Sequence, residues 1–174
     1  MYKRALEGLE KALGLDHTST LTAANGLGNL YSEQGKLKEA EEMYKRALEG
    51  YKKALGPDHT STLNTVNNLG RLYIDQGKLK EAEAMYKRAL EGFEKALGPD
   101  HTLTLSTVNN LGRLYSNQGK LKEAEEMYKR ALDGFEKALG RNHPKSAQVM
   151  HNVESLRCKQ GTISLHLELT ASVS

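Results

Sequence analysis

The chain has 174 residues, of which 27% are charged, and its 25 basic and 22 acidic side chains leave a formal net charge of +3. The two signs alternate along the chain instead of forming a basic stripe interleaved with aromatic residues, so we expect no nucleic-acid partner. No apolar run approaches the roughly 18 residues of a spanning helix, and the N-terminus lacks a signal pattern, so we expect a cytoplasmic protein with no membrane partner.

A repeat of 42 residues is the main feature of the sequence. The string Met-Tyr-Lys-Arg-Ala-Leu begins at Met1, Met43, Met85 and Met127. Segments 43–84 and 85–126 differ at only seven positions. Such a period is typical of stacked units that bury a continuous core. The sequence therefore predicts a repeat array over 1–161, with units beginning near 1, 43, 85 and 127, and a non-repeat tail over 162–174.

Each unit contains two amphipathic helical patterns, in which apolar residues recur at steps of three and four. The first pattern of the second unit is carried by Leu63, Val66, Leu69 and Tyr73. The second pattern is carried by Leu79, Ala82, Tyr86, Ala89, Leu90, Phe93, Ala96 and Leu97. Over the whole chain the patterns predict an all-α fold of about eight helices, at 2–13, 18–34, 36–55, 60–76, 78–97, 102–118, 120–139 and 144–160.

Glycine marks the predicted ends of these helices. Gly77 ends a first helix in the left-handed conformation, and Gly98 followed by proline ends a second helix. Asp100, like Asp58 in the preceding unit and Asn142 in the following one, is predicted to cap the next helix. Three further glycines lie inside second helices, where we expect the backbone of a neighbouring unit to approach closely: Gly50, Gly92 and Gly134.

These residues form a recognisable family pattern. The second unit carries Val66-x-x-Leu69-Gly70-x-x-Tyr73 and then Ala82-x-x-x-Tyr86-x-x-Ala89. This resembles the tetratricopeptide pattern, with valine in place of its tryptophan. The 42-residue unit looks like the repeats of kinesin light chains and is similar to the arrays of fungal NLR-type receptors. The resemblance implies a right-handed superhelical solenoid of antiparallel helix pairs, whose first helices line a concave groove that holds an extended, acidic peptide.

Carried over by position, the resemblance places a set of polar residues in that groove. Asparagine amides both donate and accept hydrogen bonds, so they can pair with a peptide backbone, and arginine can grip a carboxylate with two hydrogen bonds. Alternatively, Asn68 and Asn110 are satisfied locally between helices and the arginines are only solvated. The inward-facing positions also include Asn64, Asp75, Ser106 and Asn117. The predicted peptide-binding residues are Asn67, Asn68, Arg71, Asn109, Asn110 and Arg113.

The two ends of the array depart from the pattern. The chain begins partway into a second helix, so we expect an exposed stripe of Leu6, Leu9 and Leu13 that allows a homo-oligomer or a helix-swapped dimer. The last helix carries Glu154 at the packing glycine and Arg157 at the tyrosine, and is predicted to be a degenerate cap. A groove would then be formed best by the middle units. In the tail, the alternation of Ile163, Leu165, Leu167 and Leu169 with polar residues is typical of a strand, but a lone strand is not stable by itself, so we expect either a disordered tail or a segment packed on the end of the stack.

Other sites find little support in the sequence. The histidines at 17, 59, 101 and 143 share one repeat position, but equivalent atoms of successive units lie roughly 16–20 Å apart, too far to share a metal. A single cysteine, Cys158, excludes an internal disulfide, and we expect it to be partly buried. Gly26-x-Gly28 lacks the third glycine of a dinucleotide loop. We therefore expect no metal, no cofactor and no enzyme activity.

Two functions remain open. The first is a scaffold that binds a protein or peptide ligand in its groove. The second is self-association through open repeat ends, which the near identity of segments 43–84 and 85–126 favours slightly, since a discriminating groove tends to diversify its inward residues.

Overall fold

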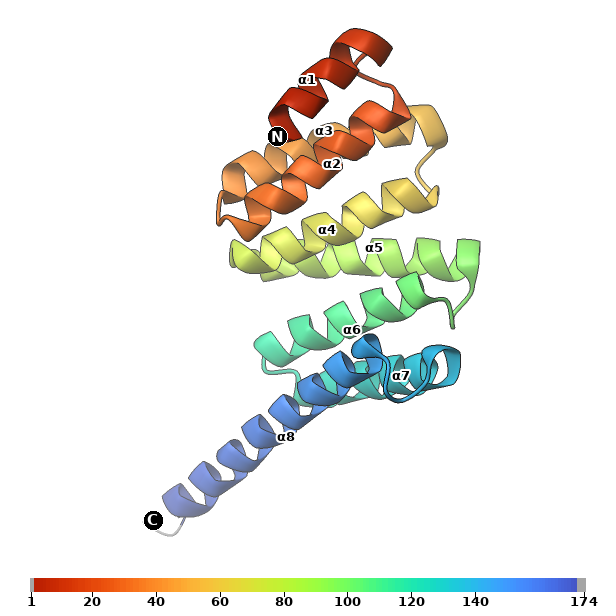
Figure 1. Cartoon of the computed structure of the whole chain (residues 1–174). Helices are drawn as coiled ribbons and strands as arrows, with labels where there is room; N and C mark the ends of the chain where they lie inside the picture. The colour runs from red at the N-terminus through yellow and green to blue at the C-terminus, as the bar shows by residue number, and fades with distance from the viewer. Residues whose placement is uncertain (1, 172–174) are drawn as a thin grey trace. The chain divides into compact units, whose positions relative to one another are not determined.

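The computed structural model describes the backbone of residues 2–171 and the side chains of residues 3–161. Within these limits every element of regular secondary structure is a helix (Figure 1). The first seven helices begin and end within one residue of the predicted bounds, which confirms the all-α fold. The eight helices are α1 (Tyr2–Leu13), α2 (Thr18–Glu33), α3 (Leu37–Leu55), α4 (Thr60–Asp75), α5 (Leu79–Leu97), α6 (Thr102–Asn117), α7 (Leu121–Leu139) and α8 (Pro144–Ala171).

The last helix differs from its prediction. It was expected to end at 160, but α8 runs on to Ala171, so the strand-like alternation of Ile163, Leu165, Leu167 and Leu169 forms no strand, and the backbone there continues the helix. A strand needs a neighbour for its backbone hydrogen bonds, whereas a helix satisfies them within one segment. Residues 172–174 of the predicted tail lie outside the described residues.

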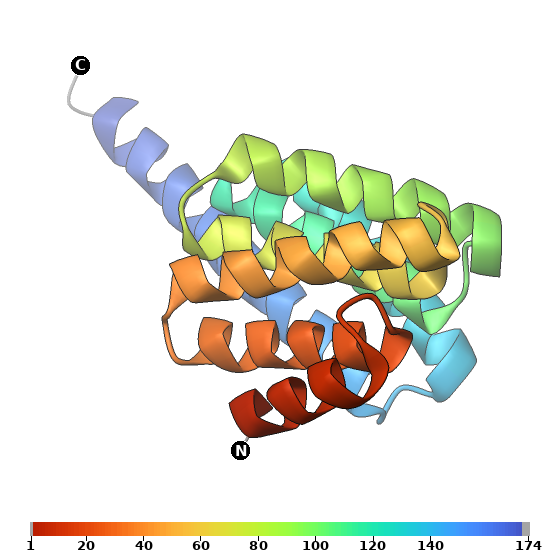
Figure 2. The same cartoon turned by 90° about the horizontal axis from the view of Figure 1, so that it is seen from above.

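The chain divides into two compact units, Met1–Gly98 and Pro99–Ser174. In the first compact unit α2 pairs with α3, and α4 pairs with α5. Helix α1 packs on α2, and α3 packs on α4. Figures 1 and 2 both show α1 lying against α2. In the second unit α6 pairs with α7, and α7 packs on α8. Direct contacts also join α2 to α4 and α6 to α8. First helices of successive pairs therefore lie beside each other in both units.

Each pair is closed by a short glycine turn. After α4, Gly77 has a φ of 74°, and Lys78 N–H donates to the carbonyl of Tyr73 at 2.8 Å. This arrangement satisfies a carbonyl at the helix end and lets the chain reverse, as predicted for Gly77. Gly98, with a φ of 90°, ends α5 in the predicted place.

The helix caps correct one prediction. The residue that caps α4 is His59 and not Asp58: the Nδ1 atom of His59 accepts the backbone N–H of Ser61 at 3.1 Å. Asp58 is one residue too early and instead accepts a hydrogen bond from Arg88 at 2.6 Å. The same cap is made at α2, α6 and α8 by His17, His101 and His143. Asp100 and Asn142, which had been predicted as caps, precede these histidines.

The core lies between the paired helices. Leu63 and Leu69 of α4 and Tyr86 and Phe93 of α5 are almost completely buried, whereas Ala96, predicted in the same stripe, is exposed. The ring of Tyr86 lies on the backbone of α4, because the position that a Cβ of Gly70 would take is 2.8 Å from two ring carbons. Tyr44 on Gly28 and Tyr128 on Gly112 repeat this contact.

The glycines inside second helices make room for side chains. A Cβ on Gly92 would lie 2.4 Å from a Leu63 methyl carbon, so the predicted close approach of a neighbouring unit's backbone is wrong. Gly50 and Gly134 make the same space for Leu21 and Leu105. These leucines come from the partner helix of the same pair, so the glycines set how closely the pair packs.

Exposure at the two ends also differs from expectation. Leu6 is buried, at 6% exposure, and Leu9 is half-buried, so the stripe predicted to be exposed on the first helix is largely covered by the packing of α1 on α2. Leu13 remains 47% exposed. Cys158, predicted to be partly buried, is exposed on α8.

A polar network joins α3 to α4. The Glu41 carboxylate accepts hydrogen bonds from Lys45 and from the Gln76 amide, each at 2.8 Å, and lies 3.5 Å from the Lys78 ammonium. The hydrogen bonds from Lys45 and Gln76 lower the pKa of Glu41 to about 2. Because burial works against this shift, the network favours the ionised carboxylate strongly.

We expect Gly70→Ala to lower the free energy of unfolding by about 1–3 kcal/mol, because the buried ring of Tyr86 has no room to move away from a new methyl group. Gly8→Ala is the matched control, because Gly8 also lies inside a helix and has no atom within 4 Å of the position of a Cβ. This substitution should raise the free energy of unfolding by up to about 1 kcal/mol. Urea denaturation measures both. A Gly70→Ala variant as stable as Gly8→Ala contradicts the packing argument.

We expect the network around Glu41 to make the free energy of unfolding depend on pH in the acidic range. Its pKa is lower in the folded chain than the ordinary value of about 4.3, so its contribution is complete above that pH and is lost as the pH falls towards about 2. Glu41→Gln should therefore cost on the order of 2 kcal/mol at neutral pH and progressively less in acid. Thermal or urea unfolding across this pH range measures the difference, and a difference that stays constant between neutral pH and pH 2 rules the explanation out.

Candidate functional site

The polar residues predicted to bind peptide lie on two first helices, α4 and α6, which belong to different units. On α4, the residues Asn67, Asn68 and Arg71 are all half-buried. The amide of Asn68 donates to the side-chain oxygen of Asn25 on α2, at 3.4 Å. Asn68 is thus engaged between two first helices, which is one of the two arrangements considered for it.

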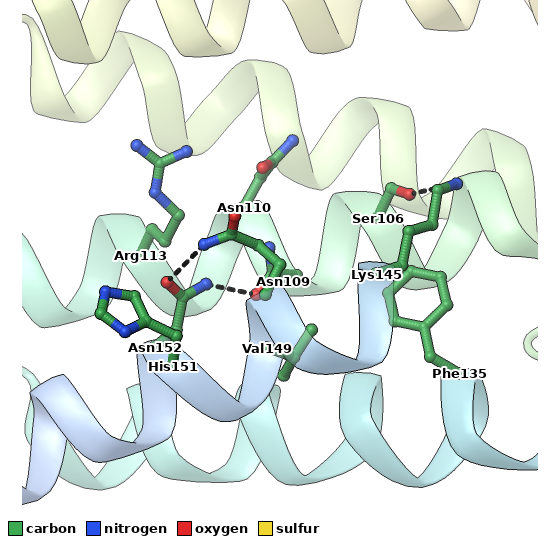
Figure 3. A pocket seen from close by; sticks show the side chains of 10 residues that line it. Ser106, Asn109, Asn110, Arg113, Phe135, Lys145, Val149, His151 and Asn152 are labelled. Atoms are coloured by element: carbon green, nitrogen blue, oxygen red, sulfur yellow. Dashed lines mark hydrogen bonds between the residues drawn. The ribbon is translucent and has the colours of Figure 1, made fainter. Parts of the chain in front are cut away.

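On α6, three of the predicted residues come together in a pocket (Figure 3). Asn109, Asn110 and Arg113 line a cavity of about 560 Å³ between α6 and α8. The other residues that line it are Ser106, Phe135, Lys145, Gln148, Val149, His151 and Asn152. The predicted site residues of α6 are therefore adjacent to one another, and the last helix, predicted to be only a cap, supplies half of the lining.

An amide–amide hydrogen bond crosses the middle of this pocket. Asn152 of α8 donates to the side-chain oxygen of Asn109 on α6 at 2.9 Å (Figure 3). Its two partners are 43 residues apart, as are Asn25 and Asn68 in the first unit. The same interaction thus recurs between α2 and α4 and between α6 and α8, and it fixes the register of neighbouring first helices.

The two ends of the pocket carry positive charge. At one end the Lys145 ammonium lies 5.5 Å from the centre of the Phe135 ring and 3.5 Å from the Ser106 hydroxyl. At the other end the side chains of Arg113 and His151 lie close to Asn152 (Figure 3). Contact with the aromatic ring and the hydroxyl restrains Lys145 without neutralising it.

A second, smaller cavity continues from the first. It measures about 140 Å³ and shares Arg113 and Asn152 with the larger pocket. Its other lining residues are Ser116, Asn117, Tyr128, Ser155 and Lys159. Lys159 of α8 reaches across to α6 and donates to the Ser116 hydroxyl at 3.0 Å. We refer to the two cavities together as the α6–α8 groove.

The described lining of the α6–α8 groove holds Arg113, Lys145 and Lys159 but no carboxylate. Cations on both sides of a hollow raise the local concentration of anions. Tyr128 adds no negative charge at neutral pH, since a tyrosine is already protonated there, and burial raises its pKa further, to about 12, an effect that Arg113 opposes. The groove is therefore electrostatically suited to an anionic ligand.

The groove also contains residues that were not predicted from the sequence, among them Lys145, His151, Asn152 and Lys159. Aligning the last helix with the repeat at a shift of 42 finds three of them, since His151, Asn152 and Lys159 then fall at the positions of Asn109, Asn110 and Asn117; Lys145 falls at the position of Leu103 and is not found in this way. The signal was present, but Glu154 and Arg157 made the helix look degenerate.

No group of three histidine, cysteine or acidic residues in the described part of the chain is arranged to hold a metal ion. In the same part, no helix combines the length and apolar character needed to cross a membrane.

Comparison with protein families gives two matches. The tetratricopeptide repeat is matched over residues 46–95 and 61–137 by one family model and over residues 20–61 by another. These matches confirm the predicted resemblance to the tetratricopeptide repeat. Among curated proteins, none matches the chain.

Several solved structures share the fold. Nearly identical TPR-like repeats of a Podospora anserina kinesin light chain superpose with a TM-score of 0.73 and 24% identity, covering 97% of this chain and 80% of that one. BtubC (BKLC) from P. vanneervenii gives 0.68 and 22%, covering 92% and 72%. Aspartyl phosphate phosphatase F from Bacillus subtilis gives 0.80 and 18%, covering 96% of this chain but 42% of that one. At these identities the likeness concerns the fold alone.

Proposed function

Because the chain belongs to the tetratricopeptide repeat family, whose repeats form scaffolds for protein interaction, we propose that its α6–α8 groove binds an extended, acidic segment of a partner protein. The observation that carries this proposal is the charge of the groove. Arg113, Lys145 and Lys159 line it from two helices, and no described lining residue is acidic.

The neutral lining supports an extended ligand in particular. Asparagine and glutamine side chains provide both donors and acceptors, which an extended peptide backbone needs at every residue. In the α6–α8 groove these are Asn109, Asn110, Gln148 and Asn152. The amides would hold the backbone while the cations select acidic side chains.

For the first compact unit, Met1–Gly98, we propose the same role for the residues of α4 at the same repeat positions. Asn67 and Arg71 would contact the backbone and a carboxylate of the ligand. Asn68 takes part through Asn25, with which it holds α2 and α4 in register. We give these residues a weaker contribution than those of α6, because the carboxylates of Glu33 and Asp75 act on Tyr44 in opposition to Arg71 and make this place less positive.

Self-association is the alternative that we propose alongside peptide binding. Leu13 and Leu15, at the start of the first unit, are 47% and 61% exposed, and burying them against a second copy would be favourable. Self-association does not depend on the α6–α8 groove, so measurements of peptide affinity and of molecular mass distinguish the two functions.

The experiment is a binding assay with extended peptides that vary in charge. We expect acidic peptides to bind and neutral or basic ones to bind at least about tenfold more weakly, since each carboxylate–cation contact contributes about 1–2 kcal/mol. The variant Arg113→Glu with Lys145→Glu should lose most of this binding while staying helical. Fluorescence anisotropy with labelled peptides gives the affinities.

The matched control is Lys122→Glu with Lys129→Glu, which makes the same change in net charge at two exposed positions of α7 outside the groove lining. If both double variants lose affinity equally, the effect is one of overall charge and the groove assignment fails. If no peptide binds and the molecular mass rises with concentration in light scattering, self-association becomes the leading account.

A further inference from the structure

The small cavity at the end of the α6–α8 groove has a composition that the rest of the groove lacks. Its seven lining residues are one arginine, one lysine, two serines, two asparagines and one tyrosine. All of these side chains can donate hydrogen bonds, and in the described lining none is a carboxylate. Its volume of about 140 Å³ corresponds to roughly five water molecules at about 30 Å³ each, which is the number of heavy atoms in a phosphate group.

The equivalent place in the first compact unit, Met1–Gly98, shows how the charge of this cavity differs. A shift of 84 residues carries the cavity onto α2, α3 and α4, where Tyr44 of α3 stands for Tyr128 of α7. Burial raises the pKa of Tyr44, Arg71 opposes the shift, and the nearby Glu33 and Asp75 carboxylates add to it. One arginine and two carboxylates thus surround Tyr44.

In the second unit both acidic positions have changed. Asn117 stands where Glu33 is, and Lys159 stands where Asp75 is. Arg113 takes the position of Asn29, so that one arginine and one lysine now line the cavity. Along the chain, this one repeat position reads Glu33, Asp75, Asn117 and Lys159, a steady change from acid to base.

The cations and donors are also held in place. Lys159 is anchored across the cavity by its 3.0 Å hydrogen bond to Ser116, and Asn152 is anchored by its 2.9 Å hydrogen bond to Asn109. Side chains that are already ordered lose less entropy when a ligand arrives.

We infer that this cavity is a phosphoryl subsite, which receives a phosphorylated serine or threonine of the peptide bound in the α6–α8 groove. The inference rests on the proposed function and deepens it. A phosphoryl group carries nearly two negative charges and three acceptor oxygens, and it is matched by Arg113, Lys159 and the surrounding hydroxyl and amide donors. A carboxylate offers one charge and two oxygens, and leaves several of these donors without an acceptor.

The test uses a peptide library with a fixed central residue, which is phosphoserine, serine or aspartate, flanked by positions drawn from aspartate, glutamate, glycine and serine. We expect the phosphoserine library to bind at least about tenfold more tightly than the serine library, with aspartate in between. The quantity compared is the ratio of the two dissociation constants for the phosphoserine and serine libraries.

Two repeat-based substitutions should abolish this gain. Lys159→Asn restores the residue of α6, and Asn117→Asp restores the residue of α4, so both introduce side chains that the repeat already carries at this position. Each should bring the ratio close to one, because the phosphoserine library should lose more affinity than the serine library, which both changes also weaken through the charge of the groove. Lys145→Gln, at the far end of the groove, should weaken both libraries and leave the ratio unchanged.

The outcomes separate the inference from the function on which it rests. If acidic serine peptides bind and phosphorylation adds nothing, the subsite is refuted and the acidic-peptide groove stands. If only phosphoserine peptides bind, the subsite is supported and the broader preference for acidic peptides is wrong. If inorganic phosphate shifts the side-chain amide NMR signals of Asn117 and Asn152 but phosphoserine gives no gain, the cavity serves a free phosphate compound and the peptide assignment is overturned.

Discussion

The contact of a tyrosine ring with a helix backbone controls the rest of this structure. Tyr44, Tyr86 and Tyr128 each lie on a glycine of the preceding helix, where a Cβ would come within 2.8 Å of ring carbons. This contact brings the helices of a pair together and buries the ring, so that the opposite face of the first helix is left for polar residues. Tyr128 shows the link directly, since it packs on Gly112 and also lines the small cavity. The packing of the repeat and the position of the groove are thus consequences of one interaction.

The repeat also explains why the groove can vary without loss of the fold. The hydrogen bonds between asparagines of neighbouring first helices use Asn25 with Asn68, and Asn109 with Asn152, and they do not involve the positions one and two turns further along the helix. Those positions hold Arg113, Asn117 and Lys159 in the second unit. Exposed charges contribute little to stability, so they can change from acidic to basic along the array at small cost.

The repeat period allowed the fold to be predicted from the sequence, because glycine turns and apolar stripes are local signals. Gly77 and Leu69 illustrate this, since each took the place that spacing alone assigned to it. The caps were misassigned because Asp58 and His59 are adjacent and only geometry decides which side chain reaches the backbone of Ser61. Of the residues that line the α6–α8 groove, Asn109, Asn110 and Arg113 were named from their repeat position, but Lys145 and Lys159 were not. Their role depends on how α8 lies beside α6, which is a contact between distant parts of the chain.

The near identity of the middle segments was an argument against a discriminating groove, but the positions of the differences point the other way. Segments 43–84 and 85–126 differ at seven positions, and three of those seven line the α6–α8 groove in the second segment: Ser106, Ser116 and Asn117. Ser106 contacts Lys145, and Ser116 anchors Lys159. At the equivalent positions of α4 the side chains are an asparagine, an isoleucine and an aspartate, and of these the isoleucine could not anchor a lysine.

The repeat is therefore uniform in the residues that pack the helix pairs, whereas much of its variation lies where α6 meets the basic side chains of α8. Self-association of identical units would not require this distribution, whereas recognition of an anionic ligand at this end of the array would.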